Sequence, residues 1–134
     1  MIQTIVDDLK DDEGYREKIY LCSEGKKTIG YGLNLEAGMP PDEAEAVLRI
    51  RAQKLYRRLD EHLNWFHEAP DDVRRVLVNM AYQLGFTGLL QFRKTLEALW
   101  EKRYSDAADE ILDSKAARQT PVRWNRHADR IRSL

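Results

Sequence analysis

Apolar residues at the start of the chain follow the spacing of an amphipathic helix. Positions three and four residues apart are apolar at Ile2, Ile5, Val6 and Leu9. Gly14 comes next and can adopt the left-handed conformation that often ends a helix. The pattern therefore predicts a helix that ends at Glu13.

Short β-prone segments follow this helix. Residues 18–21 and 28–32 are rich in β-branched and aromatic side chains, and the turn-like sequence 23–26 separates them. This arrangement predicts a β-hairpin, and residues 33–35 are a candidate third strand.

Beyond Met39 the pattern changes to helical periodicity. We expect a helix over about 40–63, a linker over 64–69 and a core helix from Pro70 to Leu84, where Gly85 stops it. Further helices are expected within 89–100, from a cap at Ser105, and from Thr120–Pro121 onward. Helices segregated from a small hairpin predict an α+β domain.

Composition narrows the class of protein. A chain of 134 residues is long enough for one domain with a core and too short for two ordinary ones. The net charge of −1 gives no reason to expect a nucleic-acid partner. The single cysteine excludes an intramolecular disulfide, and we expect neither a metal nor a cofactor. We find no signal peptide and no membrane-spanning segment, so we expect no stable membrane insertion.

Glu13 is the first candidate for chemistry. It lies at the negative end of the predicted helix dipole beside Asp11 and Asp12, and both influences disfavour the ionised carboxylate. A carboxyl group that keeps its proton can act as a general acid. The alternative is a solvated glutamate at a helix end.

Cys22 and Thr28 are ambiguous when each is taken alone. A lone cysteine after an apolar strand is commonly a small buried hydrophobe, and threonine is an ordinary strand residue. If the hairpin folds back over the end of the first helix, Glu13, Cys22 and Thr28 line one small cleft.

The order and spacing of these three residues resemble a known family. Eight residues separate Glu13 from Cys22 and five separate Cys22 from Thr28. With the glycine-rich segment 28–32, the segment 79–85 and the Gln-Thr-Pro-Val-Arg sequence at 119–123, this pattern is similar to that of the phage-type lysozymes, glycoside hydrolase family 24.

The resemblance implies a lysozyme-like α+β fold, in which a long helix joins a small hairpin lobe to a larger helical lobe. We expect a single domain over 1–134. Its hairpin lobe would be about 14–39, its helical lobe about 1–13 and 70–134, and its connecting helix about 40–63.

The resemblance also implies an activity. Such a protein is an endolysin, a muramidase that hydrolyses the β-1,4 bond between N-acetylmuramic acid and N-acetylglucosamine in peptidoglycan. Glu13 would be the general acid, Cys22 would occupy a position where many members have aspartate, and Thr28 would help to hold the attacking water. Arg123 matches an arginine that pairs with the glutamate from the other lobe in relatives. The implied substrate contacts are Asn34, Tyr82, Gln83 and Thr95.

Some alternatives stay open at this point. Cys22 can position water or form a covalent glycosyl intermediate. If the sugar's own hydroxyl attacks instead, the protein is a lytic transglycosylase, and if catalysis is lost it is a peptidoglycan-binding protein. The expected partners are glycan strands and a separate holin that releases a monomeric protein from the host cytoplasm to the periplasm or cell wall.

Overall fold

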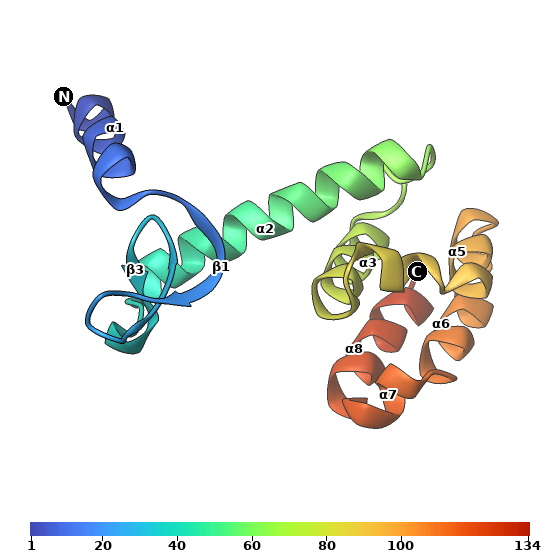
Figure 1. The fold of residues 1–134 in the computed structure, drawn as a ribbon. Coiled ribbons are helices and arrows are strands. Elements are labelled where there is room, and N and C mark those ends of the chain that lie inside the picture. The colour runs from blue at the N-terminus through green and yellow to red at the C-terminus, as the bar shows by residue number, and fades with distance from the viewer. The chain divides into compact units, whose positions relative to one another are not determined.

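The computed structural model describes all residues from Met1 to Leu134 and divides them into two compact units, Met1–Ala46 and Val47–Leu134. The elements of the first unit are α1 (Ile2–Glu13), β1 (Arg16–Leu21), β2 (Lys27–Gly30), β3 (Leu33–Asn34) and the short 3-10 helix η1 (Leu35–Ala37) (Figure 1). Helix α2 (Pro41–His62) begins in the first unit and continues into the second. The second unit also holds α3 (Asp71–Leu84), α4 (Phe86–Leu90), α5 (Arg93–Trp100), α6 (Tyr104–Leu112), α7 (Lys115–Gln119) and α8 (Pro121–Arg132). The α+β class is confirmed, and the predicted assignment of residues 1–13 to a helical lobe stays a prediction.

Helix α1 ends at Glu13 as expected, but the conformation of its cap differs from the expected one. Gly14 has a φ of 70° and a ψ of 160°, so its φ is positive while its ψ is that of extended chain. This conformation leads the backbone from the helix directly into β1. None of the α1 side chains is buried, including those on the predicted apolar face.

The three strands form one antiparallel sheet in the order β1-β2-β3, which confirms the hairpin and the third short strand. Tyr20 pairs with Thr28 across β1 and β2, and Thr28 pairs with Asn34 across β2 and β3. The turn of the hairpin is closed by two backbone hydrogen bonds, from the amide of Cys22 to the carbonyl oxygen of Lys26 (3.0 Å) and from that of Gly25 to the carbonyl oxygen of Cys22 (2.8 Å). Thr28 therefore lies in the central strand, and Cys22 begins the turn beside it.

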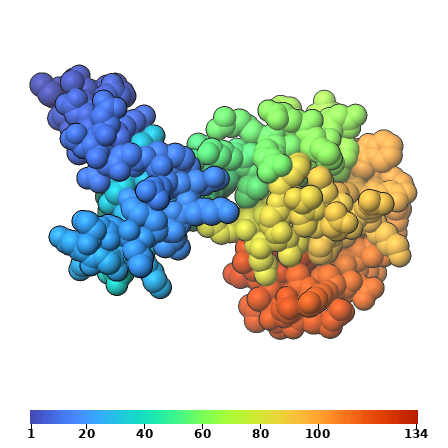
Figure 2. Space-filling model, in the orientation of Figure 1, coloured from blue at the N-terminus to red at the C-terminus, as the bar shows by residue number.

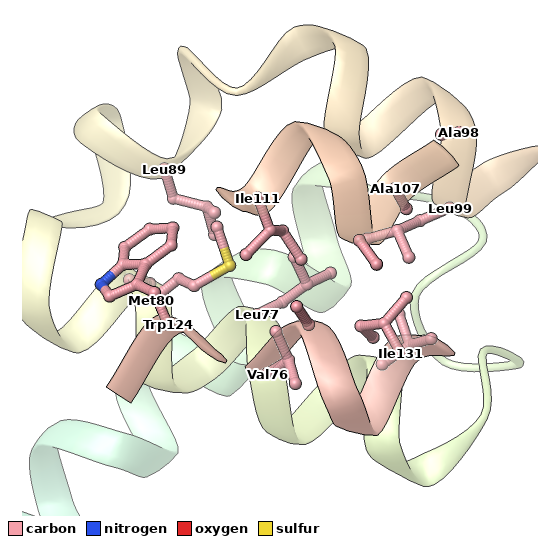
Figure 3. Close-up of a cluster of buried hydrophobic side chains, with 14 of the residues drawn as sticks. Val76, Leu77, Met80, Leu89, Ala98, Leu99, Ala107, Ile111, Trp124 and Ile131 are labelled. Atoms are coloured by element: carbon pink, nitrogen blue, oxygen red, sulfur yellow. The ribbon is translucent and has the colours of Figure 1, made fainter. Parts of the chain in front are cut away.

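The helical unit is built around α3 and α8. Its core side chains come from elements far apart in the sequence and interdigitate in one cluster (Figure 3). The largest fully buried members are Trp124, Phe66, Leu59, Leu77 and Met80. The prediction of a core helix is confirmed for α3, since Val73, Val76, Leu77, Met80 and Ala81 are buried, while Leu84 is partly buried. In the space-filling view the yellow, orange and red segments of this unit pack closely against one another (Figure 2).

Three details of the helical unit differ from expectation. The segment 64–69 is more than a linker, because Phe66 within it is fully buried and packs edge-on against Tyr56 at 5.0 Å. Helix α6 begins at Tyr104, so Ser105 lies inside the helix and caps nothing. The short helix α7 was not expected; its cap is Ser114, whose hydroxyl oxygen accepts a hydrogen bond from the amide of Ala117 (3.1 Å).

The last helix begins at Thr120 and Pro121 as expected. The Thr120 hydroxyl, however, caps the preceding helix by donating to the carbonyl oxygen of Ala116 (3.1 Å). None of the helices combines the length and the apolar character that a bilayer crossing requires.

Candidate active site

Glu13 is held against the turn that joins β2 to β3. Its carboxyl group lies directly over Gly32: a methyl group at position 32 would be 2.7 Å from the Glu13 carboxyl carbon and still closer to Oε2. Gly32 also has a φ of 74°, a conformation that side chains with a β-carbon rarely adopt. The glycine therefore allows the carboxylate to rest on the backbone of the sheet while the Glu13 residue stays exposed to solvent.

Cys22 and Thr28 are brought together by the hairpin. Thr28 is buried, with 3% of its surface exposed, and its hydroxyl donates to the carbonyl oxygen of Lys26 (2.9 Å). Cys22 is a free, partly exposed thiol close to the Thr28 side chain. The hairpin therefore places these two residues near each other, and their assignment to a catalytic site stays a prediction.

The environment of Cys22 favours the thiolate. Hydrogen bonds from the backbone of Lys26 and then of Glu24 lower the pKa of the Cys22 thiol below its ordinary value, and the Thr28 side chain adds to this effect. Desolvation and the negative charge of Glu24 oppose the shift. The backbone of the turn therefore supplies the main donors to a thiolate here, since the Thr28 hydroxyl donates its proton to the carbonyl oxygen of Lys26.

Asn34 ends β3, opposite Thr28 in the sheet. Its side-chain oxygen accepts a hydrogen bond from the amide of Glu36 (3.0 Å) and so caps η1. Glu13, Cys22, Thr28 and Asn34 thus all belong to the first unit.

The other predicted site residues belong to the helical unit, and two of them are already engaged there. Gln83 donates to the Thr120 hydroxyl (3.2 Å) and accepts from the indole nitrogen of Trp124 (3.0 Å), which fixes α3 to the start of α8. Arg123 donates to the side-chain oxygen of Asn79 (2.9 Å) and to its carbonyl oxygen (3.3 Å). The expected pairing of Arg123 with Glu13 stays a prediction.

Tyr82 and Thr95 differ sharply in exposure. Tyr82 has 48% of its surface exposed, although it lies on the core helix α3. Thr95 has only 2% exposed, among the buried positions of α5. Tyr82 can present its ring and hydroxyl to a ligand on this surface, whereas Thr95 is part of the packed interior.

Two polar residues that the structure places in specific environments, Glu36 and His127, were not singled out from the sequence. Glu36 accepts a hydrogen bond from the amide of Lys27 (2.8 Å), next to Thr28. Its signal in the sequence is Asn34, a good capping residue placed two positions earlier. His127 is a buried polar residue of α8, and its signal is its helical spacing from Trp124 and Ile131, which places it on the apolar face.

Fold and site together define a class: an α+β protein with an acidic side chain at a helix end, set on the edge of a small sheet that carries a hydroxyl and a thiol. The family model described as "Phage lysozyme" matches residues 10–129. The chain is 28% identical to "Probable T4-type lysozyme 1" of Dictyostelium discoideum over 156 aligned positions, which cover 94% of this chain and 92% of the relative. "Probable T4-type lysozyme 2" of the same organism is 26% identical with the same coverage.

The chain belongs to the phage lysozyme family. It is therefore a glycoside hydrolase of the lysozyme type, with the lysozyme-like α+β fold that the sequence predicted and peptidoglycan as the substrate of its class.

Replacing Gly32 by alanine tests whether the contact with Gly32 positions the carboxyl group of Glu13. The new methyl group must displace the carboxylate, so we expect Gly32→Ala to lower the hydrolytic rate by about tenfold or more, in line with the cost of a misplaced reacting group. The positive φ adds a loss of stability of about 1 kcal/mol. Rates of peptidoglycan solubilisation and thermal unfolding curves measure the two effects separately.

Gly38→Ala is the matched control for this variant. Gly38 has a φ of 80° and nothing within 4 Å of the position that a β-carbon would take. It shares the backbone strain without the contact to Glu13. Equal activity losses in the two variants would show that the contact with Gly32 does not position the carboxylate.

Proposed function

We propose that the chain is an endolysin, a muramidase that hydrolyses the β-1,4 bond between N-acetylmuramic acid and N-acetylglucosamine and so causes lysis of the bacterial cell. One observation carries the proposal: the carboxyl group of Glu13 rests on the turn of the same small sheet that holds Cys22 against Thr28. Membership of the phage lysozyme family supports it.

Glu13 is the general acid in this proposal. It donates its proton to the oxygen of the glycosidic bond as that bond breaks, so that N-acetylglucosamine leaves as an alcohol. Its exposure at the end of α1 gives a sugar direct access to the carboxyl group.

Cys22 and Thr28 handle the water in this proposal. The water oxygen forms the new bond to the anomeric carbon of N-acetylmuramic acid, and a Cys22 thiolate takes the proton that the water loses. The lowered pKa of the Cys22 thiol supports this role, because more of the thiol is then ionised near neutral pH. Thr28 supports it by placing a hydroxyl beside the sulfur.

The proposal assigns glycan contacts to Asn34 and Tyr82, with Gln83 and Thr95 in supporting positions. Asn34 ends β3, where it lies opposite Thr28 of β2, and Tyr82 offers an exposed ring with a hydroxyl on α3. Gln83 and Thr95 act indirectly in this proposal. Gln83 holds α3 in place through its hydrogen bonds to α8, and Thr95 is buried in α5.

The biological setting is part of the same proposal. We expect a monomer from a phage that stays in the host cytoplasm until a separate holin opens the way to the periplasm or cell wall. Cells that make the protein should then lyse only when a pore former is co-expressed. Rapid lysis of cells without a pore former would contradict the need for a holin.

Substitutions of Cys22 separate its possible roles. If Cys22 positions and deprotonates water, Cys22→Ser should keep part of the activity through its hydroxyl, while Cys22→Ala should lower kcat by about 10²-fold, the lower range for loss of a general base. If Cys22 is a nucleophile instead, both variants should be equally inactive, and the wild-type protein should gain the mass of a glycosyl group during turnover. Initial rates and intact-protein mass spectrometry decide between the two outcomes.

A test against a binding protein completes the proposal. Purified protein is mixed with Gram-negative cells whose outer membrane has been permeabilised, and with isolated sacculi. The proposal predicts a fall in turbidity and release of soluble fragments from the sacculi. Co-sedimentation with intact sacculi and no release would contradict it and would indicate a peptidoglycan-binding protein.

One observation favours a second candidate, a lytic transglycosylase. A thiol stands at a position where a carboxylate would activate water more strongly, and in its neutral form it is a weak hydrogen-bonding group. An internal hydroxyl of the sugar can then replace water as the attacking group. The ends of the released fragments distinguish this reaction from hydrolysis.

A further inference from the structure

The central strand β2 is only partly covered by its neighbour β3. Strand β3 pairs with β2 only through Asn34 opposite Thr28 and Leu33 opposite Ile29. The chain then turns into η1 at Leu35. Lys27 lies opposite Leu21 of β1, but on the β3 side its amide has no strand residue as a partner.

Glu36 supplies the missing acceptor. Its Oε2 atom accepts a hydrogen bond from the amide of Lys27 at 2.8 Å. The backbone of Glu36 is itself held, because its amide donates to the side-chain oxygen of Asn34 at 3.0 Å. A carboxylate on η1 thus continues the hydrogen bonding of the sheet beyond the end of β3.

The segment that Glu36 holds is the one that arranges Cys22 and Thr28. Lys27 lies between Lys26 and Thr28 in the chain. The carbonyl oxygen of Lys26 accepts from both the Thr28 hydroxyl (2.9 Å) and the Cys22 amide (3.0 Å). A shift of this segment would therefore move the hydroxyl and the thiol together.

We propose that Glu36 is a positioning residue for the reaction: by holding the amide of Lys27, its carboxylate fixes the segment 26–28 and with it the placement of Thr28 and Cys22. Its effect on turnover rests on the proposed function. Its effect on the environment of Cys22 does not, because that environment is a property of the folded chain alone.

Geometry rather than charge is the expected cause. Glu36 is exposed to solvent, where salt and water weaken its long-range field. The charge that acts on the Cys22 thiol is that of Glu24. Glutamine at position 36 keeps an oxygen at the same reach and should substitute for glutamate, whereas alanine has no acceptor and aspartate is too short.

The test uses the single thiol of the chain as its probe. The rate of alkylation of Cys22 by iodoacetamide is measured as a function of pH for the wild type, Glu36→Ala, Glu36→Asp and Glu36→Gln. The inference predicts that alanine and aspartate raise the apparent pKa of the Cys22 thiol toward its ordinary value, because the Lys26 backbone no longer stays in place. Glutamine should leave the titration as in the wild type.

Kinetics and a control complete the experiment. With peptidoglycan as substrate, Glu36→Ala should lower kcat by about tenfold with little change in KM, since positioning acts in the reaction step. Glu36→Gln should restore kcat. Glu17→Ala removes another exposed carboxylate of the same sheet, on β1, and should change neither readout.

Several results would overturn the inference. A wild-type thiol titration in Glu36→Ala and Glu36→Asp would do so, and so would a loss in Glu36→Gln as large as that in Glu36→Ala. If the wild type lacks all lytic activity, the proposed function fails while the thiol titration still decides the role of Glu36.

Discussion

Replacing Glu13 by glutamine is expected to lower the rate of peptidoglycan hydrolysis by about 10² to 10⁴-fold, the usual contribution of a general acid. Glutamine has nearly the same shape and can rest on Gly32 as glutamate does, but it has no proton to give to the leaving oxygen. The side chain is exposed, so the thermal unfolding midpoint should stay within the range of surface substitutions. Initial rates of fragment release and thermal unfolding curves check the two statements.

Asp12→Asn is the matched control. It makes the same acid-to-amide replacement at the adjacent position of α1, and Asp12 is also exposed. We expect this variant to keep most of the wild-type rate. A Glu13→Gln protein that retains its lytic rate would remove the general acid from the mechanism.

Acid is expected to destabilise the helical unit through His127. Only 1% of this side chain is exposed, and neither ring nitrogen has a hydrogen-bond partner. The ring packs edge-on against Trp124 at 5.5 Å. Burial, and then the charges of Arg123, Arg130 and Arg126, lower the pKa of His127 from its ordinary value of 6.5 to about 4.

Because the pKa of His127 is lower in the folded chain than in the unfolded chain, acid lowers the free energy of unfolding. The unfolded chain binds a proton at His127 near pH 6.5, whereas the folded chain resists protonation until about pH 4. The contribution to stability is complete above pH 6.5 and is lost as the pH falls from 6.5 to 4. The two pKa values differ by about 2.5 units (6.5 minus 4), so the expected loss in the free energy of unfolding is about 3 kcal/mol.

Denaturant unfolding at a series of pH values measures this loss. The wild type should lose stability between pH 6.5 and 4 through protonation of His127. His127→Leu should lack this part of the loss, because leucine has no group to protonate and fits an apolar site. His67→Gln is the control, since the His67 side chain is 77% exposed and should contribute little. Parallel curves for wild type and His127→Leu across this range would contradict the assignment.

The sequence was sufficient for features that depend on local periodicity. Helix α3 was predicted as a core helix because its apolar residues recur at helical spacing and Gly85 ends it. The hairpin was predicted because its β-prone segments flank a turn, and Cys22 and Thr28 both lie at the turn end of this hairpin.

Features that depend on contacts distant in sequence were not predictable. Phe66 lies in a segment without periodicity, and its burial is decided by Tyr56 on another element. The hydrogen bond from the Lys27 amide to Glu36 forms where β3 is too short to supply a partner for that amide. The contact between the Glu13 carboxyl group and Gly32 is a tertiary contact, and the presence of glycines in the segment 28–32 does not reveal it.

The chemical identity of the new glycan ends is the most direct test of the central claim, that this site delivers a proton from Glu13 and a water molecule to a muramic acid linkage. Sacculi are digested with the wild type and, in parallel, with Glu13→Gln, and the soluble fragments are identified by mass spectrometry. The account predicts reducing-end N-acetylmuramic acid from the wild type and almost none from the variant. Fragments that end in 1,6-anhydro-N-acetylmuramic acid, or in reducing N-acetylglucosamine, would contradict it.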